Sequence, residues 1–255
     1  MDTRLLFDED VINYDTYRPG YPRKLFDEII NYSSLTSQSH ALEIGIGTGQ
    51  ATLPILETGC DVTAVELGEN LAEYVREKYG TYGRFRVITQ DFIDTPIQNK
   101  SMDLVYSATA FHWLPPEIAY LKVKDILVKG GTLALFWNHP FPNRFEDETN
   151  VINHRVYEKY RSSNRPVVEF SESEGTKRAD MIAGYGFKDV EVRIFHRKRV
   201  LTAEDYIGLL NTYSDHRALP EPVRKAFEVD MVEGLYSVGG KINIYDTIDL
   251  YLART

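Results

Sequence analysis

Strand and helix patterns alternate between residues 38 and 139, and this alternation restricts the possible folds more than any other feature of the chain. Short apolar runs predict strands over 41–45, 61–66, 84–89, 103–107 and 132–137. Helical spacing of apolar residues predicts helices over 48–56, 70–79 and 117–128. This succession forms right-handed βαβ units with parallel strands. The chain is therefore predicted to be an α/β protein with a doubly wound, Rossmann-like, mostly parallel sheet.

The pattern changes after residue 139, where polar, irregular sequence surrounds further helices and two long alternating strands. Helices are predicted over 151–160, 179–184, 206–210 and 222–236, and strands over 190–200 and 242–252. Thr202 to Asp205 has the spacing of a helix-capping box. We expect a single domain over 1–255, with a core of about 38–139, 176–200 and 241–255 and lid segments of about 1–30, 140–175 and 201–240.

Composition excludes several functional classes. The formal net charge is −9, which disfavours binding to nucleic acid, because phosphates attract a basic face. Cys60 is the only cysteine, so disulfides and cysteine zinc sites within one chain are excluded, and no metal is expected. The acidic N-terminus does not resemble a signal peptide, and no run of 18 apolar residues occurs. We expect a cytoplasmic monomer or homodimer that does not enter a membrane.

The strongest local signal is the run Leu42-Glu43-Ile44-Gly45-Ile46-Gly47-Thr48-Gly49, at a predicted strand-to-helix junction. Glycines there allow positive φ and let a ligand approach the backbone closely. Glu66 ends the next strand, 21 residues after Gly45. In dinucleotide-type folds, an acid at that place accepts hydrogen bonds from ribose hydroxyls. The run and the acid together predict a nucleotide-like ligand.

The spacing of the glycines favours one cofactor over another. Nicotinamide and flavin folds place the third glycine five residues after the first, whereas Gly49 follows Gly45 by four. Glu43 precedes the turn, and a carboxylate there suits a ligand with an ammonium and a sulfonium. This E-x-G-x-G-x-G form resembles the first motif of class I methyltransferases that use S-adenosyl-L-methionine (SAM). The resemblance implies SAM as cofactor and a seven-stranded sheet whose last strand is antiparallel.

Other segments carry the same resemblance. Asp91-Phe92 follows the third strand, where that family binds adenine, and Asp103 to Ser107 resembles its fourth strand. Lys129-Gly130-Gly131-Thr132 matches the turn before the fifth strand. The cofactor-binding residues that the resemblance implies are Tyr14, Arg18, Glu43, Gly45, Gly47, Gly49, Glu66, Leu67, Asp91, Phe92 and Ser107.

The N-terminal stretch Tyr14 to Pro22 is similar to the opening of a subgroup that includes trans-aconitate methyltransferases. In that subgroup the segment folds over the cofactor. The resemblance implies that Tyr14 and Arg18 face its methionine end, where Arg18 can clamp a carboxylate. A structural role, in which these tyrosines attach the N-terminal helix to the core, is the alternative.

The acceptor site is predicted from residues after the fourth strand and in the second lid segment. Trp113, Tyr213 and Arg217 are candidate substrate-binding residues, and His112 and His216 are candidate catalytic bases. Each of these histidines could equally be structural. A carboxylate acceptor would need no base, only positioning by a cation. We therefore expect methyl transfer to a small molecule, and the resemblance to the trans-aconitate subgroup favours a carboxylate.

Three other interpretations stay open. The chain could be a SAM-binding regulatory protein without catalytic activity. It could be a nicotinamide-dependent oxidoreductase, although the glycine spacing and Glu43 argue against this. It could be a nucleic-acid methyltransferase, although the segment Thr109 to His112 lacks the tetrapeptide with which amino-methylating enzymes hold a flipped base, and the chain is acidic. RNA-modifying relatives without that tetrapeptide keep an RNA methyltransferase open.

Overall fold

A computed structural model describes residues 3–160 and 168–255. Seven strands form one sheet in the order β3-β2-β1-β4-β5-β7-β6. All neighbours pair in parallel except β7, which is antiparallel to both β5 and β6. The order reverses beside β1, where β2 lies on one side and β4 on the other. The structure confirms the predicted Rossmann-like sheet and its antiparallel last strand.

The first half of the sheet follows the predicted alternation closely. Its strands are β1 (His40–Ile44), β2 (Asp61–Glu66), β3 (Phe85–Thr89) and β4 (Met102–Ala108). Helices α2 (Arg23–Ser33), α3 (Leu53–Leu56) and α4 (Glu69–Tyr79) pack on one face, and α5 (Pro116–Ile126) and α7 (Glu172–Gly184) pack on the other. Strands covered on both faces explain why their sequences are nearly continuous apolar runs.

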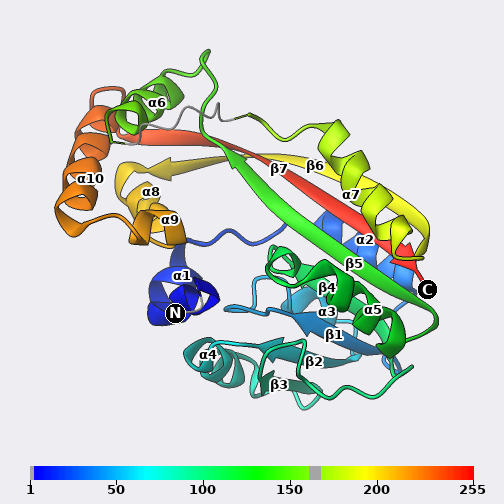
Figure 1. The fold of residues 1–255 in the computed structure, drawn as a ribbon. Helices are drawn as coiled ribbons and strands as arrows, with labels where there is room; N and C mark the ends of the chain where they lie inside the picture. Colours follow the sequence, from blue (N-terminus) through cyan, green and yellow to red (C-terminus); the bar gives the residue numbers. More distant parts are fainter. Residues whose placement is uncertain (1–2, 161–167) are drawn as a thin grey trace.

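The second half of the sheet contains long strands that leave the core. These are β5 (Leu127–Phe141), β6 (Lys188–Thr202) and β7 (Lys241–Arg254), and Figure 1 shows them extending to a separate group of helices. That group, here called the cap, contains α6 (Glu148–Tyr160), α8 (Ala203–Leu210), α9 (Ser214–Arg217) and α10 (Glu221–Tyr236). The cap has its own apolar cluster around Tyr206, Phe227 and Met231.

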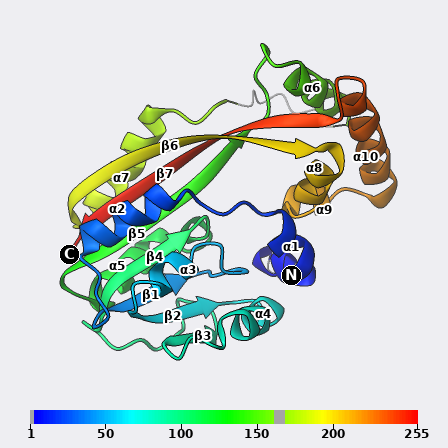
Figure 2. The same cartoon turned by 180° about the vertical axis from the view of Figure 1, so that it is seen from behind.

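The N-terminal segment lies between the cap and the first half of the sheet, as the two opposite views in Figures 1 and 2 show. It consists of the 3₁₀ helix η1 (Thr3–Glu9) and α1 (Val11–Tyr17). Asp8 accepts hydrogen bonds from the backbone N–H groups of Asn70 and Leu71 in the first turn of α4. On the cap side, the Asn13 amide donates to the Gly208 carbonyl over 3.2 Å. The segment is therefore fixed at both sides.

Among the predicted elements, the following three differ clearly from the structure. The helix expected over 48–56 is only α3, because residues 47–52 form turns and Gly49 has a φ of +85°. The helix expected over 179–184 begins earlier, at Glu172, where Ser171 and Glu174 form a capping box. The fifth strand is longer than 132–137 at both ends, because β7 pairs with it as far as Phe141. The helix start predicted at Thr202 is confirmed, because the Thr202 hydroxyl accepts a hydrogen bond from the Asp205 N–H in the first turn of α8.

In the part of the chain that the structure describes, no helix combines the length and apolar character needed to cross a membrane.

Gly208 allows α1 to dock against α8, and this generates a prediction about stability. A Cβ at Gly208 would lie 2.4–2.6 Å from ring atoms of Tyr17, so the ring would have to move. Such overpacking costs about 1–3 kcal/mol, partly offset by the higher helix propensity of alanine. We expect Gly208→Ala to lower the free energy of unfolding by about 1 kcal/mol and to expose α1 to limited proteolysis. Gly184→Ala, where no atom lies within 4 Å, is the control and should be neutral or stabilising. Equal effects of the two substitutions would contradict this account.

Candidate active site

A cavity of about 410 Å³ opens at the carboxyl ends of β1, β2, β4 and β5. This is the edge of an open α/β sheet at which ligands bind, and the volume is typical of a small-molecule site. One half lies over β1–β3 and is lined by Gly45, Gly47, Glu66, Leu67, Asp91 and Phe92. The other half lies over β4 and β5 and is lined by Thr109, His112, Trp113, Asn138 and cap residues. The N-terminal segment contributes Arg4, Phe7, Tyr14 and Arg18.

The glycine turn forms the floor of the first half. Gly45 and Gly47 have φ values of +69° and +56°, which strongly favour glycine at both positions. A Cβ at Gly45 would lie 2.6 Å from the Cβ of Ala110, so the turn is in close contact with the loop after β4. The nearest atom to a Cβ at Gly47 is 3.6 Å away, on the Tyr14 ring. The turn is therefore closely packed at Gly45 and leaves space at Gly47, on the side of the cavity.

Glu66 connects this turn to the loop after β2. One carboxylate oxygen accepts the Gly47 N–H at 2.9 Å, and the other accepts the Gly68 N–H at 3.0 Å. Burial raises the pKa of Glu66, while these backbone donors act in the opposite direction. A carboxylate has about four lone-pair positions, more than its backbone donors occupy, so Glu66 can still accept a hydrogen bond from a ligand hydroxyl. Glu66 lies on the cavity wall beside the glycine turn, and its predicted contact with a ribose stays a prediction.

Glu43 does not line the cavity, in contrast to the prediction that it contacts the cofactor. It lies behind the turn, and one of its oxygens accepts hydrogen bonds from the hydroxyls of Thr52 (2.7 Å) and Tyr106 (2.8 Å). Burial raises the pKa of the Glu43 carboxyl to about 7. The physical reason is the side-chain alternation of a strand: Glu43 points into the layer beneath the sheet edge, where it ties the turn to β4.

Asp91 and Phe92 line the cavity as predicted. The Asp91 carboxylate accepts the Ile93 N–H at 2.9 Å and pairs with Arg4 of the N-terminal segment at 2.8 Å. The ammonium of Lys122 donates to three carbonyls of this loop, those of Phe92, Ile93 and Thr95. The loop after β3 is thus held rigidly, and the covering segment reaches across the cavity to Asp91.

Tyr14 and Arg18 also lie on the cavity wall. The Arg18 guanidinium lies over the rings of Tyr14 and Tyr213, at 4.9 and 4.4 Å from their centroids. Its Nη2 donates to the Thr212 carbonyl at 2.8 Å. Its Nε is buried and has no protein partner among the described residues. A free, buried N–H on a cation suits an anionic oxygen of a ligand, such as an amino-acid carboxylate.

Four other predicted site residues lie away from the cavity. Gly49 is covered by the Tyr79 ring, and the Ser107 hydroxyl donates to the Ile44 carbonyl inside the sheet. His216 is buried in the cap, where a ring nitrogen meets the Tyr157 hydroxyl at 2.7 Å. Arg217 pairs with Glu9 on the N-terminal segment. The structure therefore gives these residues roles in holding the turn, the sheet and the lid together.

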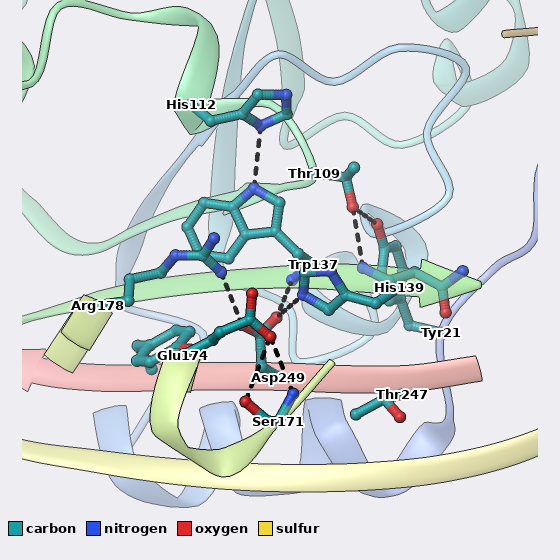
Figure 3. A network of polar contacts seen from close by, with 12 residues as sticks. Tyr21, Thr109, His112, Trp137, His139, Ser171, Glu174, Arg178, Thr247 and Asp249 are labelled. Atoms are coloured by element: carbon teal, nitrogen blue, oxygen red, sulfur yellow. Dashed lines mark hydrogen bonds and ion pairs between the residues drawn. The ribbon is translucent and has the colours of Figure 1, made fainter. Parts of the chain in front are cut away.

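The His112 ring lies on the cavity wall, and its tautomer follows from its neighbour. The Trp137 indole N–H donates to His112 Nδ1 at 3.0 Å, as Figure 3 shows. Indole is only a donor, so Nδ1 carries no proton and the neutral ring carries its proton on Nε2. Burial lowers the pKa of His112, and the positive charge of Arg178 and nearby His139 act in the same direction. His112 is thus a neutral ring with an Nε2–H donor.

Trp137 is itself fixed by a buried carboxylate. Asp249 accepts the Trp137 backbone N–H (3.1 Å), the Tyr251 hydroxyl (2.7 Å) and a guanidinium N–H of Arg178 (2.7 Å). The Arg178 guanidinium also lies 3.9 Å from the centre of the Trp137 ring. His139, which the sequence suggests together with Trp137 as a further wall residue, has its Nε2 3.0 Å from the same carboxylate. This network orients the indole that orients His112.

Sequence reasoning did not identify Tyr21, Thr109 and Asn138 as lining residues. Thr109 directly follows β4 and has a φ of +52°, which is costly for a β-branched residue. Its hydroxyl lies 2.7 Å from the Tyr21 hydroxyl and accepts the Asn138 N–H at 3.3 Å. The only sequence feature that points to Thr109 is its position directly after the fourth strand. Neither a threonine nor an asparagine by itself indicates a residue that lines a cavity.

Comparisons with known proteins agree with this geometry. Residues 42–135 match a family described as "Methyltransferase domain". A methyltransferase-like protein of Schizosaccharomyces pombe, itself uncharacterised, is 27% identical over 231 residues, covering 89% of this chain and 84% of that protein. A probable SAM-dependent methyltransferase of Saccharomyces cerevisiae is 29% identical over 198 residues, covering 72% of this chain and 65% of that protein.

Solved structures show the same fold. A Haemonchus contortus phosphoethanolamine N-methyltransferase in complex with SAM aligns with a TM-score of 0.58 at 14% identity, covering 100% of this chain and 60% of that one. The YcgJ protein of Bacillus subtilis aligns with a TM-score of 0.57 at 15% identity, covering 92% and 99%.

Residues 42–135 thus form a methyltransferase domain, and the relatives together with the site identify SAM as its cofactor. The chain's own residues fit the cofactor, because the turn is open at Gly47, Glu66 retains acceptor positions and Arg18 Nε lacks a partner. The methyltransferase would hold the nucleoside between Glu66 and Asp91 and the amino-acid end near Tyr14 and Arg18. The likeness to the trans-aconitate subgroup stays a prediction.

The position of Glu66 in the cofactor site predicts that its substitution weakens cofactor binding. Glu66→Gln replaces one carboxylate oxygen by an NH₂ group. This group cannot accept a hydrogen bond, so either the Gly47 N–H or the Gly68 N–H loses its partner. Hydrogen bonds to charged groups contribute about 1.5–3 kcal/mol, so we expect roughly 10–150-fold weaker binding of S-adenosylhomocysteine by calorimetry. Glu69→Gln, in the first turn of α4, is the control. Unchanged affinity in folded Glu66→Gln would reject the assignment.

The raised pKa of Glu43 predicts a pH-dependent stability difference. Between its ordinary pKa of 4.5 and its native value of about 7, the folded protein holds a proton that the unfolded chain releases. The free energy of unfolding therefore falls as the pH rises through this interval. Glu43→Gln removes this dependence and keeps an oxygen that can accept from Thr52 and Tyr106. We expect the stability of the variant relative to wild type to increase between pH 5 and pH 8 by up to about 3 kcal/mol in cofactor-free protein. A difference that is constant with pH would contradict the burial of a titrating carboxyl.

Proposed function

We propose that this enzyme transfers the methyl group of SAM to a carboxylate oxygen of a small molecule. The observation that carries the proposal is the bond from Trp137 to His112 Nδ1, which leaves Nε2–H as a donor at the cavity wall. A donor binds an oxygen that already has free lone pairs. It cannot remove a proton from a hydroxyl or an ammonium.

The size and cover of the cavity support a small acceptor. About 410 Å³ has to hold both reactants, and residues of the N-terminal segment and the cap line this space. Arg4 bridges to Asp91 and Arg217 bridges to Glu9, so the cover is attached on two sides. A lid of this kind excludes water and aligns the reactants, which can contribute roughly 7–11 kcal/mol to catalysis in favourable cases.

The chemistry required of the protein is modest. SAM, when bound, supplies a methyl group activated by its sulfonium. A carboxylate oxygen forms the new C–O bond while the C–S bond breaks, and no proton is transferred. In the proposed role, His112 donates to the acceptor carboxylate and Trp113 forms part of the wall beside it. Arg178, which Asp249 holds against the Trp137 ring, helps keep the indole and therefore the His112 donor in one orientation.

The proposal is tested with labelled SAM and two panels of small molecules, carboxylic acids and primary amines. Methyl esters release their label as methanol in alkali, whereas N-methyl products retain it. Alkali-labile label from the acid panel is the expected result. Alkali-stable label from amines alone would replace the proposed acceptor, and tight cofactor binding without transfer to either panel would favour a regulatory protein.

Two substitutions at His112 separate a donor from a base. Glutamine can accept from the Trp137 indole and still donate an N–H, but it cannot act as a base. We expect His112→Gln to retain most of kcat/KM, with no dependence on pH between 6 and 8, and His112→Ala to lose roughly 10–150-fold. Equal, large losses in both variants, with a wild-type rate that rises through the pKa of a histidine, would assign His112 as a general base instead.

A further inference from the structure

Two buried polar atoms in the described parts of the chain, Arg18 Nε and Asn138 Oδ1, have no hydrogen-bond partner. Both residues line the same cavity. Buried polar groups almost always have partners, and an unmet one costs about 1–3 kcal/mol. The amino-acid end of SAM accounts for Arg18. Nothing in the cofactor assignment accounts for Asn138, which lies at the end of β5 on the acceptor side of the cavity.

The orientation of the Asn138 amide is determined by a second buried carboxylate. Asn138 Nδ2 donates to Asp246 Oδ1 at 3.4 Å, and the Asp246 side chain is fully buried. Two guanidinium groups, those of Arg197 and Arg199, hold Asp246 in place. If the amide were reversed, its carbonyl oxygen would face the carboxylate, and both would be acceptors. The NH₂ end is therefore directed to Asp246, and the carbonyl is the end left without a partner.

The backbone on both sides of this carbonyl is also held. The Asn138 N–H donates to the Thr109 hydroxyl, which in turn bonds with the Tyr21 hydroxyl. Thr109 adopts positive φ at this point, and such strain in non-glycine residues is concentrated at binding and catalytic sites. The acceptor side of the cavity thus includes His112, which has an N–H donor, and Asn138, whose buried carbonyl oxygen has no protein partner among the described residues.

We propose that Asn138 is a specificity-determining residue, and that the acceptor molecule carries a hydrogen-bond donor, such as a hydroxyl, in addition to the carboxylate that receives the methyl group. This inference rests on the proposed function. A substrate without the donor leaves the Asn138 carbonyl buried and unpaired, which disfavours its binding relative to a hydroxylated analogue.

Matched pairs of acids test the inference: lactate with propanoate, 3-hydroxybutanoate with butanoate, and malate with succinate. For wild type, we expect kcat/KM for the hydroxylated member of at least one pair to be about 5–150-fold higher, from the cost of one unmet buried group. In Asn138→Leu and Asn138→Ala, this ratio should fall to about one, mainly because the hydroxylated acid reacts more slowly. The ratio compares two substrates on the same enzyme, so a lower folded fraction does not change it.

Asn143→Ala is the matched control, because Asn143 is the next asparagine along the chain and does not line the cavity. It should keep the wild-type ratio. Dissociation constants for the same pairs, measured in the S-adenosylhomocysteine complex, report discrimination without turnover. A wild-type ratio of one, in rate and in binding, or a ratio that survives both Asn138 substitutions, would overturn the inference. Absence of alkali-labile methyl label, with discrimination still seen in binding, would instead overturn the proposed carboxylate chemistry alone.

Discussion

The carboxylate of Glu66 holds together the two loops from which the cofactor cavity is built. It accepts one backbone N–H from the glycine turn and one from the loop that begins α4. The N-terminal segment is attached beside the same loop, because Asp8 accepts hydrogen bonds from the backbone N–H groups of Asn70 and Leu71 in the first turn of α4. A Cβ on Gly68 would lie 2.3 Å from the Asp8 carboxylate, so the absence of a side chain there lets the cover close. The glycine turn under the cavity and the N-terminal segment beside it are thus both attached to the backbone around the start of α4.

The acceptor side is organised by two buried carboxylates of β7. Trp137 and Asn138 are neighbours on β5, so their side chains leave opposite faces of the sheet. Asp249 fixes Trp137 on one face, and through it His112. Asp246 orients Asn138 on the other face. Arg178 pairs with Asp249, and Arg197 and Arg199 pair with Asp246, which compensates for the cost of burying these charges. Charges that lie outside the cavity therefore decide what its wall can bind.

Much of the fold and half of the site could be predicted from local sequence. The strands, the glycine turn, Glu66 and Asp91-Phe92 lie where periodicity and motif spacing put them. Prediction was wrong for the helix over 48–56, because a glycine-rich turn that continues to residue 52 cannot be distinguished from a helix start by apolar spacing alone. The sequence also grouped Glu43 with the cofactor-binding residues, whereas in the fold its carboxylate lies behind the glycine turn, against Thr52 and Tyr106, which only the layer order of the sheet decides.

The sequence by itself determined the alternating core, the positive-φ turn and the acids at the strand ends, since each depends on residues a few positions apart. Tertiary structure alone decided which side chains face the acceptor and in which hydrogen-bonding state. The proton on His112 depends on Trp137, 25 residues away, and the free carbonyl of Asn138 depends on Asp246, 108 residues away. Such states are fixed by partners that the fold brings together, and no local pattern encodes them.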